Sequence, residues 1–420
     1  MKLKKLLIPF SFILSTLYLF SCGPNEPGDP PELVPIPGYQ HDIPWPSLAD
    51  SPWPKFRHDA QGTNRSQYSG PTQGVIEWVN KDFMMMTGAA TIGYNNEIFL
   101  ASLGFETGIY KLNGNTGEII WRYDSLGRVI DLHPCPIVLS DSNIIASSGS
   151  EGRLLKLNIE GNLLWEFKAD AQIYNKGIGV DKLGNIYFID HLHKLYCISP
   201  NGELVWSQQN DLFGPYGNIS IVFSPDGQTI YFEGFGVGLV AFDIINKSIK
   251  WTFGNINGVS FPMVDSQGHI YFLSQNNEIN NEHSLYCLNE DGTVNWYFEH
   301  GDKDVTEGGS GAPPCIDRDG NIYFATSYKL FSLYYSGDLR FSKKNVDGGY
   351  DDIIIDKNNN LYIWISGDDP RGLVLDNKGK TILEIHNGID KMPKIFNAIS
   401  SEGQWIVCSY EWINSIYSIK

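Results

Sequence analysis

Three aspartate-rich turns are the first places where this sequence could bind a metal ion. They read Asp181-Lys182-Leu183-Gly184-Asn185, Asp265-Ser266-Gln267-Gly268 and Asp317-Arg318-Asp319-Gly320-Asn321. A full calcium loop has oxygen ligands at alternate positions, a glycine at the sixth position and a glutamate at the twelfth. In the third turn Ile322 follows Asn321, so the pattern stops there. We therefore interpret all three segments as hairpin turns capped by an aspartate.

Histidine and serine residues offer the next candidate chemistry. His191 and His193 lie two residues apart and would share one face of a strand. Zinc needs at least one further nearby ligand, which the spacing does not indicate, so we expect a loop or core pair. No serine lies in a nucleophile elbow, and acyl transfer therefore has no support in the sequence.

The cysteines after Cys22 are scattered along the chain, with no CxxC motif and no adjacent pair. They are Cys135, Cys197, Cys287, Cys315 and Cys408. Two of them, Cys197 and Cys287, occupy the same place in a repeated pattern, where other copies have alanine or serine. That place needs only a small buried residue. We predict packing thiols, not disulfides or metal ligands.

The elements that would position any site come from this repeat. A bulky residue in a short apolar strand recurs about every 43 residues along the chain. In order, these residues are Trp78, Trp121, Trp165, Trp206, Trp251, Trp296, Phe341 and Leu383. Such a period is typical of a propeller blade, and no stretch shows sustained helical periodicity.

Each repeat reads as a four-stranded antiparallel meander. Second-strand copies such as Gly184–Phe188 and Gly320–Phe324 are rich in β-branched and aromatic residues and follow a tight turn. A third strand such as Ile109–Asn113 and another turn lead to the strand that carries the bulky residue. A single blade cannot bury its apolar faces, so the blades must stack around an axis.

The two ends of the chain are offset by one strand. The strand at Trp78 has no blade before it, and the third-strand copy Ile416–Ile419 has no outer strand after it. We predict that Val75–Trp78 completes the last blade, which closes the ring and removes two exposed edges. The predicted fold class is all-β, an eight-bladed β-propeller of four-stranded antiparallel blades. Seven blades is the alternative if the repeat at Leu373–Leu383 is misread.

The N-terminal residues differ from the repeats. A basic start precedes an apolar stretch, Leu6–Phe20, that is too short to span a bilayer, so residues 1–21 read as a signal peptide. The cysteine that follows a small residue resembles the lipobox of bacterial lipoproteins and makes Cys22 the expected lipid attachment site. A general secretory signal is the alternative. We predict a lipidated, proline-rich tether over residues 22–52 and a propeller over residues 53–420.

Two segments resemble the quinoprotein (PQQ)-like propeller family. Residues 112–121, Leu-Asn-Gly-Asn-Thr-Gly-Glu-Ile-Ile-Trp, are similar to its tryptophan-docking repeat, and residues 53–66 look like the segment that opens many members. The resemblance covers residues 53–420 and implies the fold, but a superfold hosts many functions. Enzymes of the family bind pyrroloquinoline quinone and calcium. Their alcohol-dehydrogenase type also stacks the quinone on a disulfide between adjacent cysteines, which this sequence does not have.

The non-catalytic branch of the family fits the sequence better. It includes the lipoprotein subunit of the outer-membrane β-barrel assembly machinery. The resemblance implies a binding or scaffold protein of the bacterial cell envelope, lipid-anchored at the outer membrane, with a protein partner and no enzymatic activity, cofactor or metal. The alternatives are a PQQ-dependent dehydrogenase-like enzyme and a glycan-binding surface lipoprotein. We expect a monomeric propeller that touches the membrane only through its lipid.

Charge and loop composition bear on the partner surface. The net charge of −17 argues against nucleic acid and against an anionic membrane face. The connections from each outer strand to the next inner strand share one face of the ring, where mixed aromatic, methionine and acidic residues would suit a protein or small polar ligand. Ordinary loop composition is the alternative. The candidate binding residues are Met84, Met85, Asp131, His133, Phe213, Tyr216, Glu307, Tyr350 and Asp351.

Overall fold

The computed structural model describes residues 36–83, 88–102, 107–125, 135–148, 151–174, 177–214, 220–254, 256–277, 284–301, 312–327, 329–344, 348–367, 370–386, 394–410 and 415–420. The chain divides into Met1–Ile36 and a compact unit, Pro37–Lys420, and the fold below is that of the compact unit. The predicted signal peptide and Cys22 lie outside the described residues. Within the described ranges, no helix is long and apolar enough to cross a membrane.

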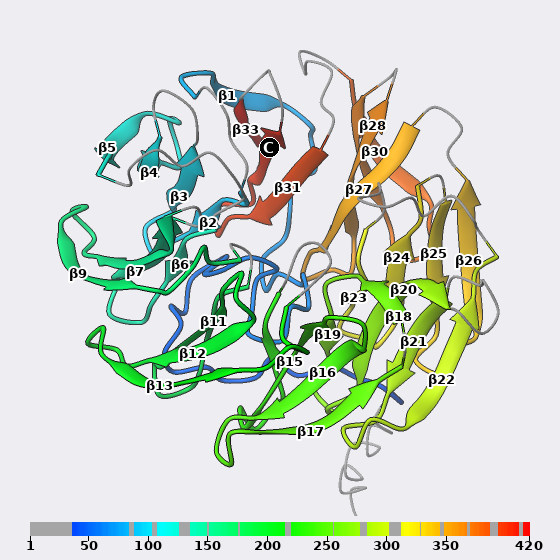
Figure 1. Cartoon of the computed structure of the whole chain (residues 1–420). Coiled ribbons are helices and arrows are strands. Elements are labelled where there is room, and N and C mark those ends of the chain that lie inside the picture. Colours follow the sequence, from blue (N-terminus) through cyan, green and yellow to red (C-terminus); the bar gives the residue numbers. More distant parts are fainter. Residues whose placement is uncertain are drawn as a thin grey trace, which may run out of the picture. The chain divides into compact units, whose positions relative to one another are not determined.

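Eight antiparallel sheets surround a common centre (Figure 1). Each sheet has four strands in a simple meander, and the fifth sheet has one additional short strand at its inner end. The prediction of an all-β, eight-bladed propeller is confirmed. The repeat at Leu373–Leu383 forms a complete blade, so the seven-bladed alternative is wrong. We number the blades 1 to 8 in chain order.

The two inner layers of strands line the axis. The innermost strands are β2 (Thr91–Ile92), β6 (Ile137–Val138), β10 (Gly179–Val180), β14 (Val222–Phe223), β18 (Ile256–Val259) with β19 (Met263–Val264), β23 (Cys315–Ile316), β27 (Gly348–Ile355) and β31 (Lys394–Ile399). The second strands are β3 (Glu97–Ser102), β7 (Ile144–Ser148), β11 (Ile186–Ile189), β15 (Thr229–Gly234), β20 (Ile270–Asn277), β24 (Ile322–Ala325), β28 (Leu361–Gly367) and β32 (Trp405–Tyr410).

The two outer layers complete the blades. The third strands are β4 (Gly108–Asn113), β8 (Arg153–Leu157), β12 (Lys194–Ile198), β16 (Gly238–Asp243), β21 (Ser284–Leu288), β25 (Lys329–Leu333), β29 (Arg371–Leu375) and β33 (Ile416–Ile419). The outer strands are β5 (Ile119–Tyr123), β9 (Leu163–Lys168), β13 (Leu204–Gln209), β17 (Ser248–Phe253), β22 (Val294–Glu299), β26 (Leu339–Lys344), β30 (Thr381–Ile385) and β1 (Ile76–Asn80).

The first and last strands of the chain close the ring as predicted. β1 pairs antiparallel with β33, and Trp78 lies opposite Ser418. Blade 8 therefore consists of β31, β32, β33 and β1. Because its outer strand comes from the other end of the chain, the last blade cannot separate from the ring without breaking this ladder.

Burial explains the apolar patterns in the sequence. Every residue of the second strand β11 is buried, whereas the outer strand β9 alternates between exposed and half-buried residues. The second and third strands of a blade lie between two neighbouring blades and read as apolar runs. The outer strands face solvent on their outer side, which leaves the bulky residue of each repeat as an inward anchor.

Neighbouring blades are joined by these anchors. The indole Nε1 of Trp121 donates a 2.9 Å hydrogen bond to Ile159 O, in the turn between the third and fourth strands of the next blade. Trp78, Trp165, Trp251 and Trp296 make the same bond, to Gly114 O, Pro200 O, Glu290 O and Tyr335 O. A glycine of that turn lies under the ring: a Cβ on Gly161 would be 2.8 Å from Trp121, and its φ is +84°. Only glycine meets both demands without strain.

The compact unit begins earlier than the sequence predicted. Residues 37–52, expected to belong to the tether, already contact the ring: Trp45 Nε1 donates to Val180 O, and Gln40 is completely buried. Their many prolines lower the number of backbone donors, but side chains and the remaining amides make the contacts. Residues 37–52 are therefore part of the compact unit, and we call residues 37–66 the axial segment.

Candidate functional site

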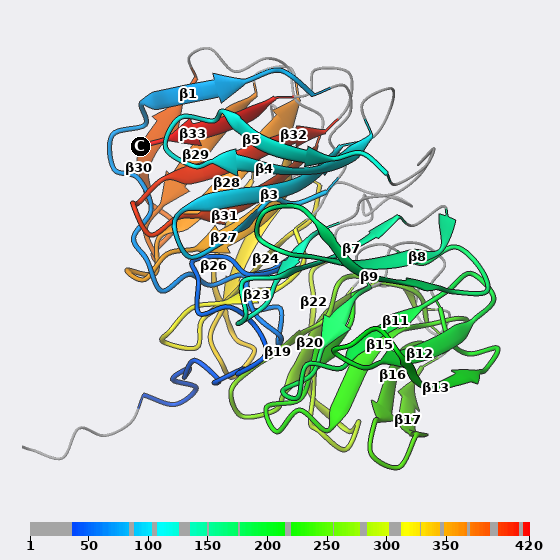
Figure 2. The same ribbon diagram turned by 90° about the vertical axis from the view of Figure 1, so that its left-hand side faces the viewer.

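The axial segment crosses the middle of the ring (blue in Figure 1) and follows one side of it in Figure 2. It contacts the innermost strands of six blades, through pairs that include Trp53 with Ile92, Ala49 with Val138, Trp45 with Val180, Ala60 with Phe223, Gln61 with Val264, and Asn64 with Ile355. The side that it follows carries the turns between first and second strands and between third and fourth strands. One mouth of the axis is thus occupied by the chain itself.

Arg57 is the central cation of this segment. Its side chain is 1% exposed, and its Nε and Nη2 donate to Gly62 O at 3.0 and 2.9 Å. Nη2 also donates to Pro314 O, next to the inner strand of blade 6. Burial lowers the pKa of Arg57 from its ordinary value, which Asp352 and Asp59 partly offset. The guanidinium therefore ties the turn at Gly62 to the ring.

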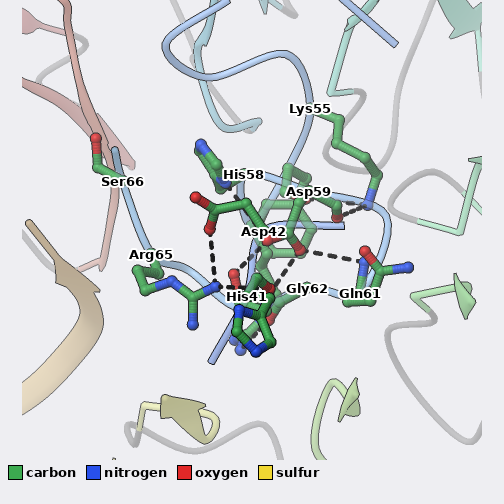
Figure 3. Close-up of polar contacts among 12 residues, drawn as sticks. His41, Asp42, Lys55, His58, Asp59, Gln61, Gly62, Arg65 and Ser66 are labelled. Atoms are coloured by element: carbon green, nitrogen blue, oxygen red, sulfur yellow. Dashed lines mark hydrogen bonds and ion pairs between the residues drawn. The ribbon is translucent and has the colours of Figure 1, made fainter. Parts of the chain in front are cut away.

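Asp59 organises the neighbouring turn (Figure 3). Its carboxylate accepts hydrogen bonds from the backbone N–H groups of Gln61 and Thr63 and from the Thr63 hydroxyl, and it lies 3.5 Å from His58 Nδ1. Burial would raise the pKa of Asp59, but its hydrogen bonds with His58 and Thr63 lower that pKa well below the usual range. The group remains ionised inside the ring.

Lys55 and Arg65 complete the charged cluster. Burial lowers the pKa of Lys55 to about 8, although its Nζ donates to Phe56 O and Asp59 O. Arg65 Nη2 donates to Asp42 Oδ1 at 3.0 Å (Figure 3). The other oxygen of Asp42 accepts from Arg318 of blade 6 at 3.0 Å. These contacts join the start of the axial segment to its end and to the ring.

The hydrogen bonds of this charged cluster suit a structural role, in which the cluster holds the axial segment in place. We call it the structural lock. Its nitrogens are directed mainly to backbone carbonyls, and its carboxylates mainly to N–H groups of the same segment. Within the described ranges, no three His, Cys, Asp or Glu side chains converge to hold a metal ion. In the sequence, the structural lock corresponds to the charged stretch Lys55–Arg65. This stretch lies in the segment that resembles the opening of the propeller family, but the resemblance gives it no role.

Comparisons with known proteins identify the family. The family model described as outer membrane protein assembly factor BamB matches residues 70–296, which is more than half of the 420-residue chain. The chain belongs to this family. The match begins just after the axial segment and ends within the outer strand of blade 5, so it covers most of the ring. A search of curated proteins found no match.

Solved structures share the fold of this BamB family member. BamB from Moraxella catarrhalis has a TM-score of 0.58 at 13% identity, with 82% of this chain and 97% of that chain covered. Quinohemoprotein alcohol dehydrogenase from Comamonas testosteroni has a TM-score of 0.62 at 11% identity, with 89% and 80% covered. The Dos1 propeller has a TM-score of 0.60 at 16% identity, with 82% and 95% covered. At such identities these similarities establish the fold alone.

Three of the predicted binding-face residues are among those described, and all three are buried. Phe213 is 0% exposed and packs edge-on against Phe232 and Phe242. Tyr350 and Asp351 in β27 are 1% and 7% exposed. The structure therefore does not place these three side chains on an exposed surface. The remaining candidates lie outside the described residues and stay predictions: Met84, Met85, Asp131, His133, Tyr216 and Glu307.

The aspartate-rich turns are hairpin caps, as predicted. Asp181 Oδ1 accepts from the backbone N–H groups of Leu183 and Asn185, and its Oδ2 accepts from the Tyr187 hydroxyl at 3.0 Å. Asp317 repeats this arrangement with Tyr323. The carboxylate oxygens are thus occupied by donors within the same hairpin, which explains the conserved spacing of the turn among the blades.

The histidine pair and the cysteines also have structural places. His191 and His193 lie in the turn before β12, where His191 stacks on Tyr174 with ring centres 4.1 Å apart. The five cysteines after Cys22 are all buried and unbridged, as predicted. Cys197 and Cys287 lie opposite Trp206 and Trp296, and burial raises their pKa values to about 11 and about 12. They fill the space beside the anchors.

Proposed function

We propose that this protein is a lipid-anchored binding or scaffold protein of the bacterial cell envelope that holds protein partners and catalyses no reaction. Its membership of the BamB family carries the proposal. A lipid on Cys22 would tether the propeller to the outer membrane through the residues that precede the axial segment. The side along which the axial segment lies is in contact with the chain itself, so partners are proposed to bind the opposite face or the outer rim.

Crosslinking in the native envelope tests this proposal. The lipid-anchored protein is crosslinked in intact cells, purified, and its covalently attached proteins are identified. We expect envelope proteins, with components of β-barrel assembly among them. Recovery of no attached protein would contradict the scaffold role, and recovery without any assembly component would count against the closer analogy. In a Cys22→Ala control, the protein should leave the membrane fraction.

A quinoprotein dehydrogenase is the second candidate, favoured by the fold shared with the Comamonas testosteroni alcohol dehydrogenase. Such an enzyme would bind pyrroloquinoline quinone and Ca²⁺ tightly enough to change the absorbance of the quinone and to raise the melting temperature of the protein. We expect neither change on titration of the purified protein. A saturable response in both readouts would replace the scaffold proposal with the enzymatic one.

A further inference from the structure

The outer strand of blade 3 differs from the other seven. β13 reads Leu-Val-Trp-Ser-Gln-Gln and has no charged side chain. Each of the other outer strands has at least one, and these are Glu77, Arg122, Glu166, Lys168, Lys250, Glu299, Arg340, Lys343, Lys344 and Glu384. Charged side chains on an edge discourage pairing with another chain. Blade 3 is the one blade whose outer edge does not have this protection.

The backbone of β13 is available for pairing. The strand ends the sheet of blade 3 and pairs with β12 alone. In the described part of the chain, no backbone hydrogen bond outside that ladder involves residues 204–209. Its outward N–H and C=O groups can therefore accept an added strand, which is the way that many proteins bind extended peptides.

Exposed apolar side chains lie beside this edge. Leu204 and Val205 are 50% and 54% exposed, and Ile245, in the adjacent turn of blade 4, is 65% exposed. Trp206 is the next residue of the same strand, and its ring centre lies 5.9 Å from that of Phe242. In contrast to the five anchors above, the Trp206 indole N–H donates no hydrogen bond among the described residues. A partly exposed tryptophan among aliphatic side chains is a frequent centre of binding energy.

A positive charge borders the same patch. The ammonium group of Lys247 lies 6.0 Å from the centre of the Trp206 ring. No carboxylate of the described residues forms an ion pair with it, and the carboxylate of Asp243, at the start of the same turn, accepts from the amides of Ile245 and Asn246. A ligand with its acidic group near Lys247 and apolar groups toward Leu204 complements this distribution.

We propose that the outer edge of blade 3 binds an extended segment of a partner protein as an added β-strand. Main-chain hydrogen bonds to β13 would provide affinity. Alternate apolar side chains would contact Leu204, Val205 and Ile245, and a carboxylate would contact Lys247. The inference rests on the proposed scaffold function and adds to it the binding surface and the class of segment that binds there.

Site-specific photocrosslinking tests the proposal in the full-length, lipid-anchored protein. A photoreactive amino acid replaces Val205 in one variant and Ile382 of β30 in the control. Both residues are about half exposed and directly precede the bulky residue of their repeat. A second pair of variants adds Gln208→Lys, which places a charge on the edge of β13. Melting temperatures check that every variant is folded.

We expect protein adducts at position 205, few at position 382, and loss of the position-205 adducts in the Gln208→Lys background. Equal yields at the two positions, or adducts that survive Gln208→Lys in a folded protein, would overturn the proposal. An adduct with the mass of two copies of this chain would do so as well, because it would identify self-association. If position 205 captures nothing while chemical crosslinking recovers envelope proteins, the scaffold function is supported and the edge of β13 is not the binding surface.

Discussion

Two neighbouring blade junctions each contain a tryptophan and a turn of the next blade, but they differ in how the turn meets the tryptophan. Between blades 2 and 3, Trp165 donates to Pro200 O and its ring lies over Gly202. Between blades 3 and 4, Trp206 has no such acceptor among the residues that the structure describes, and Lys247 takes the glycine position with a φ of 54°. Side chains fill both junctions, and both junctions join neighbouring blades. The repeat thus tolerates a junction of a different kind between blades 3 and 4. This junction leaves an aromatic ring, aliphatic side chains and a charge on the outer rim.

Removal of the two tryptophans should separate the junctions most clearly. Trp165→Ala should lower the free energy of unfolding by about 3 kcal/mol, because it removes a large packed ring and a hydrogen bond. Trp206→Ala should cost less by about 1 kcal/mol, because no hydrogen bond of the indole is lost. Urea unfolding of both variants measures the difference. Equal losses, or a larger loss for Trp206→Ala, would show that the junctions are equivalent.

The glycine of the regular junction should be nearly as sensitive. A Cβ on Gly202 would lie 2.6 Å from the Trp165 ring, and the φ of this residue is +86°. We expect Gly202→Ala to cost about 2 kcal/mol, from overpacking together with the left-handed backbone. Gly236, which has a φ of +71° but no atom within 4 Å of an added Cβ, is the matched control. Gly236→Ala should cost about 1 kcal/mol from backbone strain alone.

The reverse substitution at the irregular junction should have a small effect of opposite sign. Lys247→Gly removes a left-handed lysine but also its contact with Trp206. The gain from relaxed backbone and the lost cation–π contact nearly cancel, so we expect a stabilisation of no more than about 0.5 kcal/mol. Thermal unfolding measures it. A clear destabilisation would mean that the lysine holds the junction as firmly as a glycine does elsewhere.

Acid should affect the turns between the third and fourth strands of blades 3 and 4 differently. Burial tends to raise the pKa of Asp243, but hydrogen bonds from Asn246 and Ile245 lower it below the ordinary value of 3.8. These bonds therefore contribute above that value and are lost as the pH falls through the lowered pKa. Amide exchange at Ile245 and Asn246 should accelerate there, while the turn at Ser199, in which a serine hydroxyl and not a carboxylate accepts from the turn amide, stays unchanged. Equal acceleration in both turns would contradict this assignment.

The sequence predicted the ring but not its departures. The period of the bulky residues determined eight blades, and the offset of Trp78 and Ile416–Ile419 predicted how the ring closes, because both features repeat or balance along the chain. The docking of residues 37–52 was not predictable, since a proline-rich composition is equally typical of a free tether. Burial of Phe213 depends on neighbouring strands, and a left-handed Lys247 leaves no signal in local composition.

Photocrosslinking at the two junctions shows whether the junction between blades 3 and 4 binds a partner. The photoreactive amino acid is placed at Val205 in blade 3 and at Leu164 in blade 2, which are 54% and 50% exposed and directly precede Trp206 and Trp165. In the native envelope, we expect partner-protein adducts predominantly at position 205. Equal yields at both positions, or no protein adduct at either, would contradict the claim that the irregular junction is a binding surface.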